Sequence, residues 1–190
     1  MSASSVPLAD TVGLLERAIG YAICTARRLS PQLMTSPTPC RDWNLGTLLR
    51  HLNDSLAVLH EGFDTHRIGS GTGADSDADP VTTFHERAWR LFGTATAAAG
   101  RTEPITLLDR PLATSAVAAV GAVEIAVHAW DISQACHHTH PIPGDLAGAL
   151  LDIAPPLLTG CRRRLFDPPV AVSPLAPASD RLVAFLGRHP

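Results

Sequence analysis

The feature that most constrains the fold is a stripe of apolar residues between positions 45 and 63. Its members recur at alternating intervals of four and three, which places them on one face of an α-helix: Leu45, Leu49, Leu52, Leu56, Leu59 and Phe63. A stripe of this length needs a partner surface along its whole extent, which is typical of helical bundles. Asn44 directly precedes it and suits the N-cap, because its side chain can accept a hydrogen bond from a free backbone amide.

Three further long helices are expected around this segment. Apolar residues at helical spacing predict a first helix over residues 11–29. An Asp-Pro pair at 79–80 predicts the start of a third helix that ends around residue 100, with the Asp as cap and the Pro in the first turn. An Ala- and Val-rich fourth helix is expected over residues 114–137.

The remaining segments predict shorter or irregular structure. A Gly-, Ser- and Asp-rich stretch is expected to be a mobile loop over residues 67–79, and residues 102–113 to be extended with a possible minor strand pair. A fifth helix begins near Asp145 and is expected to break at Pro155-Pro156. Residues 165–190 are expected to be extended, with a short closing helix.

These elements predict an all-α fold and a single domain over residues 1–190. A net charge of -3 gives no basic surface, so nucleic acid is not expected as a partner. The N-terminal sequence lacks a positive, apolar leader, and the sequence shows no run of apolar residues that predicts a membrane span. We therefore expect no membrane partner, a cytoplasmic location and four reduced cysteines.

The chemistry is expected on the fourth helix. Glu124 and His128 are four residues apart, so their Cβ atoms lie about 6 Å from each other on one face. Asp131 follows on the same face, in a helix otherwise made of apolar residues, and burying these groups is costly unless a charge compensates them. Asp131 can accept a hydrogen bond from a metal-bound imidazole, pair with an arginine such as Arg41, or anchor the helix end. It is also a candidate catalytic residue.

His51 lies beside the apolar stripe of the second helix and is expected to point near the bundle interior. One interpretation is a buried neutral histidine that is bonded to a carbonyl. The other is a metal ligand, since His51, Glu124 and His128 form the three-ligand set of zinc sites that keep one coordination position open. We predict the metal site at these three residues.

Two segments resemble hallmarks of the DinB-like, mycothiol-dependent maleylpyruvate isomerase family. Residues 38–52, TPCRDWNLGTLLRHL, resemble the first hallmark, in which a Trp starts the second helix and a His follows. Residues 124–135, EIAVHAWDISQA, resemble its Glu-x-x-x-His-x-Trp-Asp helix. The tail, residues 168–190, is similar to the ending of a group of actinobacterial members.

The resemblance implies an up-down-down-up four-helix bundle that holds one divalent ion, usually zinc, at the residues matching His51, Glu124 and His128. It also implies a catalytic arginine near the third helix, for which Arg87 and Arg90 are the candidates; the alternative is two solvated arginines on an outer face. Complete isomerases carry an additional C-terminal domain, which we do not expect in this chain.

The function implied by this resemblance is a metal-dependent enzyme that acts on a small molecule with a low-molecular-weight thiol, mycothiol. Thiol transfer and thiol-assisted isomerisation both fit. The alternatives are a hydrolase that uses metal-activated water and a non-catalytic protein that binds a metal and a small molecule. A monomer or a homodimer is expected.

Overall fold

The computed structural model describes residues 8–40, 43–69, 79–158 and 166–190. Helices dominate these residues, with one small sheet. The long helices are α1 (Leu8–Ala26), α2 (Leu45–Thr65), α3 (Pro80–Ala97), α4 (Thr114–Ala135) and α5 (Gly144–Leu158). The short elements are η1 (Pro31–Leu33), α7 (Ala178–Phe185) and the strands β1 (Arg67–Ile68), β2 (Ile105–Leu107) and β3 (Arg110–Leu112).

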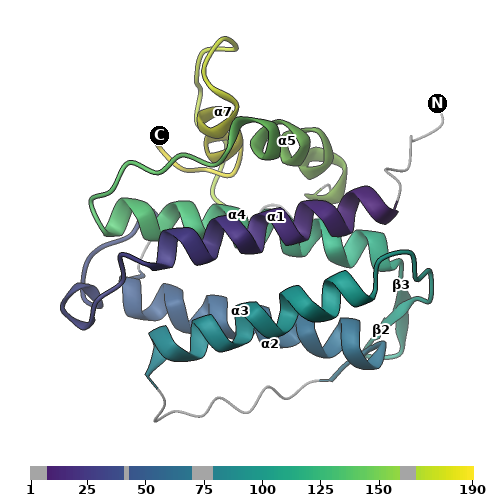
Figure 1. The fold of residues 1–190 in the computed structure, drawn as a ribbon. Coiled ribbons are helices and arrows are strands. Elements are labelled where there is room, and N and C mark those ends of the chain that lie inside the picture. Colours follow the sequence, from purple (N-terminus) through teal and green to yellow (C-terminus); the bar gives the residue numbers. More distant parts are fainter. Residues whose placement is uncertain (1–7, 41–42, 70–78, 159–165) are drawn as a thin grey trace.

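The first four long helices form the bundle. α1 packs mainly on α4 and α2 mainly on α3, while α1 also contacts α3 and α2 also contacts α4. Figure 1 shows that α1 and α4 run in one direction and that α2 and α3 run in the other. The prediction of an all-α, up-down-down-up bundle is confirmed. α5 and α7 pack on each other and cover the α1–α4 layer on the side away from α2 and α3 (Figure 1).

The helix that carries the apolar stripe has the expected structure. The side chain of Asn44 accepts a hydrogen bond from the backbone amide of Thr47, at 2.9 Å, and so caps α2. All six apolar residues of the stripe are buried. α2 ends at His66, whose left-handed backbone (φ 56°) turns the chain out of the helix.

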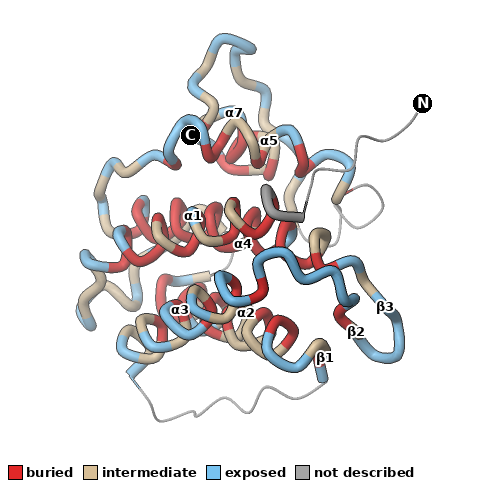
Figure 2. Tube along the Cα trace, turned by 45° about the vertical axis from the view of Figure 1, so that its right-hand side comes forward, coloured by how far each residue is buried: buried red, intermediate tan, exposed pale blue. Residues whose placement is uncertain are grey.

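α4 is the central helix of the fold. It packs against α1, α2 and α5, and it is buried almost all around, as the red tube in Figure 2 shows. A helix that packs on three sides is apolar over most of its surface, which explains its Ala- and Val-rich sequence. By length and composition α4 could cross a membrane, although the sequence pattern predicts no membrane span. However, 78% of the apolar stretch is buried inside the fold.

The small sheet closes one end of the bundle. β1 pairs in parallel with β2, and β2 pairs antiparallel with β3. Leu108 and Asp109 join β2 to β3 with positive φ values of 45° and 67°, as in a tight two-residue hairpin. β1 occupies the first two residues of the segment expected to be a loop over 67–79, because β2 offers it a backbone partner that sequence patterns cannot reveal. Residues 70–78 lie outside the described residues.

Other boundaries differ modestly from the predictions. α3 begins where expected, with the Asp79 side chain accepting from the amide of Thr82 at 2.9 Å. The prediction that α5 breaks at Pro155-Pro156 is wrong, because both prolines lie inside the helix, in its last turn. Both are exposed, so their rings lie on the solvent side of the helix. α7 lies within residues 165–190, where a closing helix is expected.

Candidate metal centre

His51, Glu124 and His128 come together between α2 and α4. Their ligand atoms all lie within 4.8 Å of one another, which is close enough for one metal ion. Glu124 Oε1 lies 2.7 Å from His51 Nε2 and 3.2 Å from His128 Nε2. The structure therefore places the three predicted ligands around one point. Among the described residues, it is the one group of at least three such side chains that could hold a metal.

The two helices hold this group from opposite sides. α2 buries its apolar stripe against the bundle and leaves His51, whose side chain is 38% exposed, at the edge of the core. The Trp43 ring packs on the His51 ring, with their centroids 4.8 Å apart. The centroid of the Trp43 ring lies 6.1 Å from that of the His128 ring. The imidazoles of His51 and His128 meet edge to face, with centroids 5.1 Å apart. Trp43 thus neighbours both imidazoles from the N-terminal end of α2.

His128 is held through both ring nitrogens. Its Nδ1 lies 3.0 Å from Asp131 Oδ2, and its Nε2 faces Glu124. Burial alone would lower the pKa of His128, but the hydrogen bonds and charges of Asp131 and Glu124 outweigh it and raise the pKa to about 9. With Nδ1 directed at Asp131, Nε2 is the nitrogen available to an ion beside Glu124.

Glu124 remains ionised in this setting. Burial would raise its pKa, but hydrogen bonds from His128 and His51 and their charges lower it below the usual range of a glutamate. Ser55 Oγ is a third neighbour, 3.5 Å from Oε1. A carboxylate that faces two imidazoles has the donor chemistry of a zinc ligand set.

The surroundings of Asp131 contain a partner that sequence reasoning missed. Asp131 is completely buried and accepts hydrogen bonds from Arg188, at 3.3 Å from Nε and 2.9 Å from Nη2, in addition to its contact with His128. Arg41, the partner named from the sequence, lies outside the described residues. The available signal was the cost of burying Asp131, which demands a cation without indicating which one.

The two candidate catalytic arginines have other partners or none that joins them to His51, Glu124 or His128 among the described residues. Arg87 Nη1 donates to the backbone carbonyl of Asn53 at 2.9 Å and lies 3.6 Å from Asp54, so it ties α3 to α2. Arg90 is exposed. Within the described part of the chain, neither arginine forms a hydrogen bond or ion pair with the three ligands, and their catalytic role stays a prediction.

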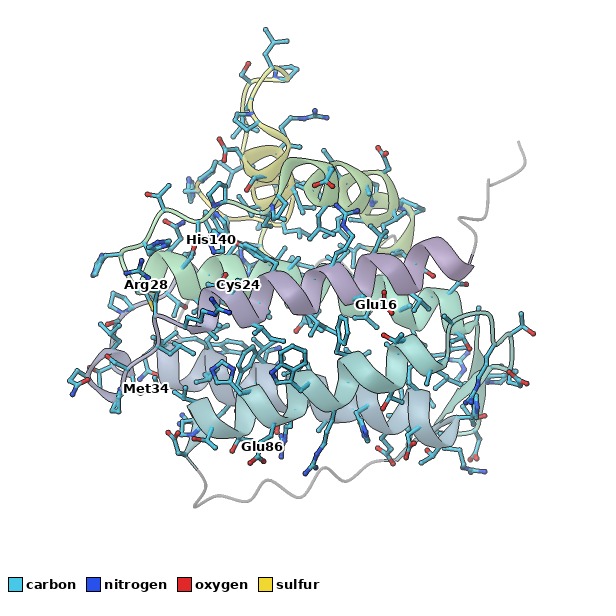
Figure 3. All side chains as sticks on the ribbon, in the orientation of Figure 1. Glu16, Cys24, Arg28, Met34, Glu86 and His140 are labelled. Carbon is cyan, nitrogen blue, oxygen red and sulfur yellow. The ribbon has the colours of Figure 1, made fainter. Side chains whose placement is uncertain are left out.

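Three histidines follow α4, His137, His138 and His140, and they form no group that could hold a metal among the described residues. His140 lies beside the end of α1 (Figure 3), where its Nδ1 is 3.0 Å from Thr25 Oγ1 and its backbone carbonyl accepts from the Tyr21 hydroxyl. Its ring also stacks edge to face with that of His138. These contacts connect the loop after α4 to α1.

Cys40 does not have the properties of a nucleophile. Burial raises the pKa of its thiol to about 11, so at neutral pH it stays protonated. Cys24, Cys40 and Cys136 are free thiols, and Cys161 lies outside the described residues. This agrees with the expectation of reduced cysteines for the three that are described.

A small apolar pocket of about 30 Å³ adjoins Glu124. It is lined by residues of α4, the end of α5 and the segment before α7: Val120, Val123, Glu124, Leu157, Leu158 and Phe166. The candidate metal centre thus has a polar side made by its ligands and an apolar recess beside one of them.

Comparison with known proteins places the chain in a family. Searches of curated proteins and of solved structures gave no match. The family model of the mycothiol maleylpyruvate isomerase N-terminal domain matches residues 17–133. This span is more than half of the chain and includes His51, Glu124, His128 and Asp131, while Arg188 lies beyond it. The chain therefore belongs to the mycothiol maleylpyruvate isomerase N-terminal domain family.

Proposed function

We propose that this protein is a metal-dependent enzyme that directs mycothiol, or a similar low-molecular-weight thiol, at an electrophilic small molecule. The family is one of mycothiol-related, metal-binding DinB-like domains. The observation that carries the proposal is the convergence of His51, Glu124 and His128 within 4.8 Å. In this proposal the three residues hold one divalent ion, zinc.

The donor set fits such an ion on structural grounds. Two imidazoles and one carboxylate are ligands that zinc accepts, and three protein ligands leave one tetrahedral position for a substrate. Glu124 faces two imidazole nitrogens, at 2.7 Å and 3.2 Å, and an ion among the three groups would compensate the same buried charge. The contact between His128 and Asp131 would remain in place, since it uses the other ring nitrogen.

When bound, a zinc ion at an open site stabilises a thiolate at neutral pH. The chain's own residues would arrange the remainder of the site. Asp131 keeps the His128 ring in one orientation, and Trp43 covers both imidazoles. The recess beside Glu124, with Val120 and Phe166 in its wall, would receive an apolar part of the electrophile and exclude water from it.

Both thiol transfer and thiol-assisted isomerisation are compatible with this arrangement. They differ in whether the thiol remains attached to the product. Arg87 and Arg90 remain the candidates for a cation that assists either reaction, and Arg87 would have to leave the carbonyl of Asn53 to do so.

The test is a rate measurement with the zinc-loaded protein, mycothiol and a chromogenic electrophile such as a chlorodinitrobenzene, with maleylpyruvate as a second substrate. We expect turnover that requires both the metal and the thiol and that is lost in His51→Ala. His60→Ala, on the same helix, is the matched control. Product formation at full rate without a thiol would instead indicate a hydrolase. Tight binding of the small molecule without turnover would indicate a binding protein.

A further inference from the structure

Asp131 connects the candidate metal centre to the C-terminal segment of the chain. It lies one turn after His128 on α4, and it is completely buried. Its Oδ2 is shared between His128 Nδ1, at 3.0 Å, and Arg188 Nη2, at 2.9 Å, while its Oδ1 accepts from Arg188 Nε at 3.3 Å. Two parallel hydrogen bonds from one guanidinium fix both oxygens of a carboxylate, so Arg188 determines how Asp131 presents Oδ2 to the imidazole.

Arg188 is itself fixed on its remaining sides. Its Nη1 donates to the backbone carbonyl of Leu186 at 2.9 Å, so all three guanidinium nitrogens have an acceptor. The ring of Phe166 lies 5.7 Å from its central carbon. Only 5% of the side chain is exposed. A cation held this firmly can determine a position, whereas an exposed arginine would only add charge.

The backbone before Arg188 is shaped to aim it inward. α7 ends in a turn in which the amide of Gly187 donates to Ala184 and that of Arg188 to Val183, at 3.0 Å and 2.9 Å. Gly187 has a φ of +84°, and a Cβ there would lie 2.7 Å from the carbonyl oxygen of Asp167. Only glycine fits both the conformation and the contact, and this turn leads Arg188 back toward α4.

We propose that Arg188 is a positioning residue for the metal centre: through Asp131 it holds the His128 ring with Nδ1 turned away from the ion and Nε2 turned toward it. The inference rests on the proposed metal site. It adds that residues beyond the part matching the family model complete that site. A carboxylate behind a metal-bound imidazole orients the ring and strengthens its binding, and loss of such a partner lowers metal affinity about 10- to 100-fold.

The test compares Arg188→Met, Arg188→Lys and Asp131→Asn with the control Arg181→Met, which removes an exposed arginine of α7. Zinc affinity is measured by competition with a chromogenic chelator, and the fold is checked by circular dichroism. We expect Arg188→Met and Asp131→Asn each to lose about 10- to 100-fold in affinity. Arg188→Lys should recover part of the loss, and the control should stay within twofold of the wild type.

The double variant Asp131→Asn/Arg188→Met separates positioning from general stabilisation. If Arg188 acts through Asp131, the double variant loses no more affinity than Asp131→Asn alone. Losses that multiply would overturn the inference, and so would wild-type affinity in folded Arg188→Met. If Arg188→Met fails to fold, Arg188→Lys replaces it in the same comparison of single and double variants.

A second readout does not require metal. In the metal-free protein, ¹⁵N spectra of the imidazoles report whether Nδ1 of His128 keeps its proton and its hydrogen bond. We expect Arg188→Lys to weaken that signal and Arg181→Met to leave it unchanged; an unchanged His128 signal in Arg188→Lys would contradict the inference. If the wild type binds no zinc, the proposed function fails while this readout still tests Arg188. If zinc binds without thiol turnover, the reaction fails and the inference stands.

Discussion

His51 Nε2 and Glu124 Oε1 lie 2.7 Å apart, although the two residues are 73 positions apart in the chain. This contact joins α2 to α4 at the point where the three candidate ligands meet. Because the third candidate ligand, His128, lies on the same helix as Glu124, the site depends on how closely the two helices approach. Its metal affinity should therefore respond both to the ligands and to the packing between α2 and α4.

Removal of either histidine should abolish tight metal binding. His51→Ala and His128→Ala each leave only Glu124 and one histidine of the three candidate ligands. We therefore expect zinc affinity to fall more than about 100-fold, which exceeds the loss expected from removing a carboxylate that only supports a ligand. Elemental analysis should find about one ion per chain in the wild type and in His60→Ala, and little in the two variants. A metal-free wild type that binds no zinc at micromolar concentration would contradict the site.

The sequence was sufficient for the features that depend on local patterns. The four-three stripe predicts α2, and Asn44 and Asp79 cap their helices as expected. The i, i+4 spacing of Glu124 and His128 puts them on one face. In each case the deciding interaction lies within a few residues along the chain.

The features that sequence reasoning missed depend on contacts between distant segments. Arg188 is 57 residues from Asp131, and nothing in the spacing of the chain pairs them. β1 exists because β2 lies next to it. Pro155 is tolerated in α5 because it faces solvent, and propensity alone does not reveal which side of a helix is exposed.

Zinc binding should release protons at neutral pH. Below a pKa of about 9 the folded, metal-free protein keeps His128 protonated, and an ion needs the lone pair of its Nε2. Binding at pH 7 should therefore release about one proton from His128, and apparent affinity should rise about tenfold per pH unit toward pH 9 and then level off. Calorimetry in two buffers of different ionisation enthalpy measures the release. An affinity that is constant from pH 7 to 9 would refute this.

Gly121 should control the spacing between α4 and α2. Gly121 lies one turn before Glu124 on α4. A Cβ at this position would lie 2.8 Å and 2.9 Å from the two end methyl groups of Leu59 on α2. Gly121→Ala gains helix propensity but overpacks this contact, whereas Gly93→Ala on α3 gains the propensity with no atom within 4 Å. We expect Gly121→Ala to be about 1–3 kcal/mol less stable than Gly93→Ala in urea unfolding. Equal stabilities would show that the Leu59 side chain can shift to make room, so that Gly121 does not set the spacing of the helices.

The apolar recess beside Glu124 should determine how the electrophile binds. Val120 lines the recess and is 46% exposed, so Val120→Trp can narrow it without disturbing the core. We expect kcat/KM for the electrophile to fall about tenfold through a higher KM, with zinc affinity unchanged. Leu175→Trp, at a position that is 95% exposed, is the control for adding an indole. An unchanged KM in Val120→Trp would place the electrophile elsewhere.

Gly187 and Gly100 offer a matched pair of substitutions that test whether the turn before Arg188 positions this residue. Both have a φ of +84°, but a Cβ at Gly187 would meet Asp167 at 2.6 Å, while one at Gly100 would meet nothing within 4 Å. Gly100→Ala should cost only the strain of the left-handed conformation, about 1–2 kcal/mol, and leave zinc affinity unchanged. Gly187→Ala should cost more stability and also lower zinc affinity, because the displaced turn withdraws Arg188 from Asp131. Thermal unfolding and chelator competition measure the two effects, and wild-type zinc affinity in folded Gly187→Ala would show that the turn does not position the site.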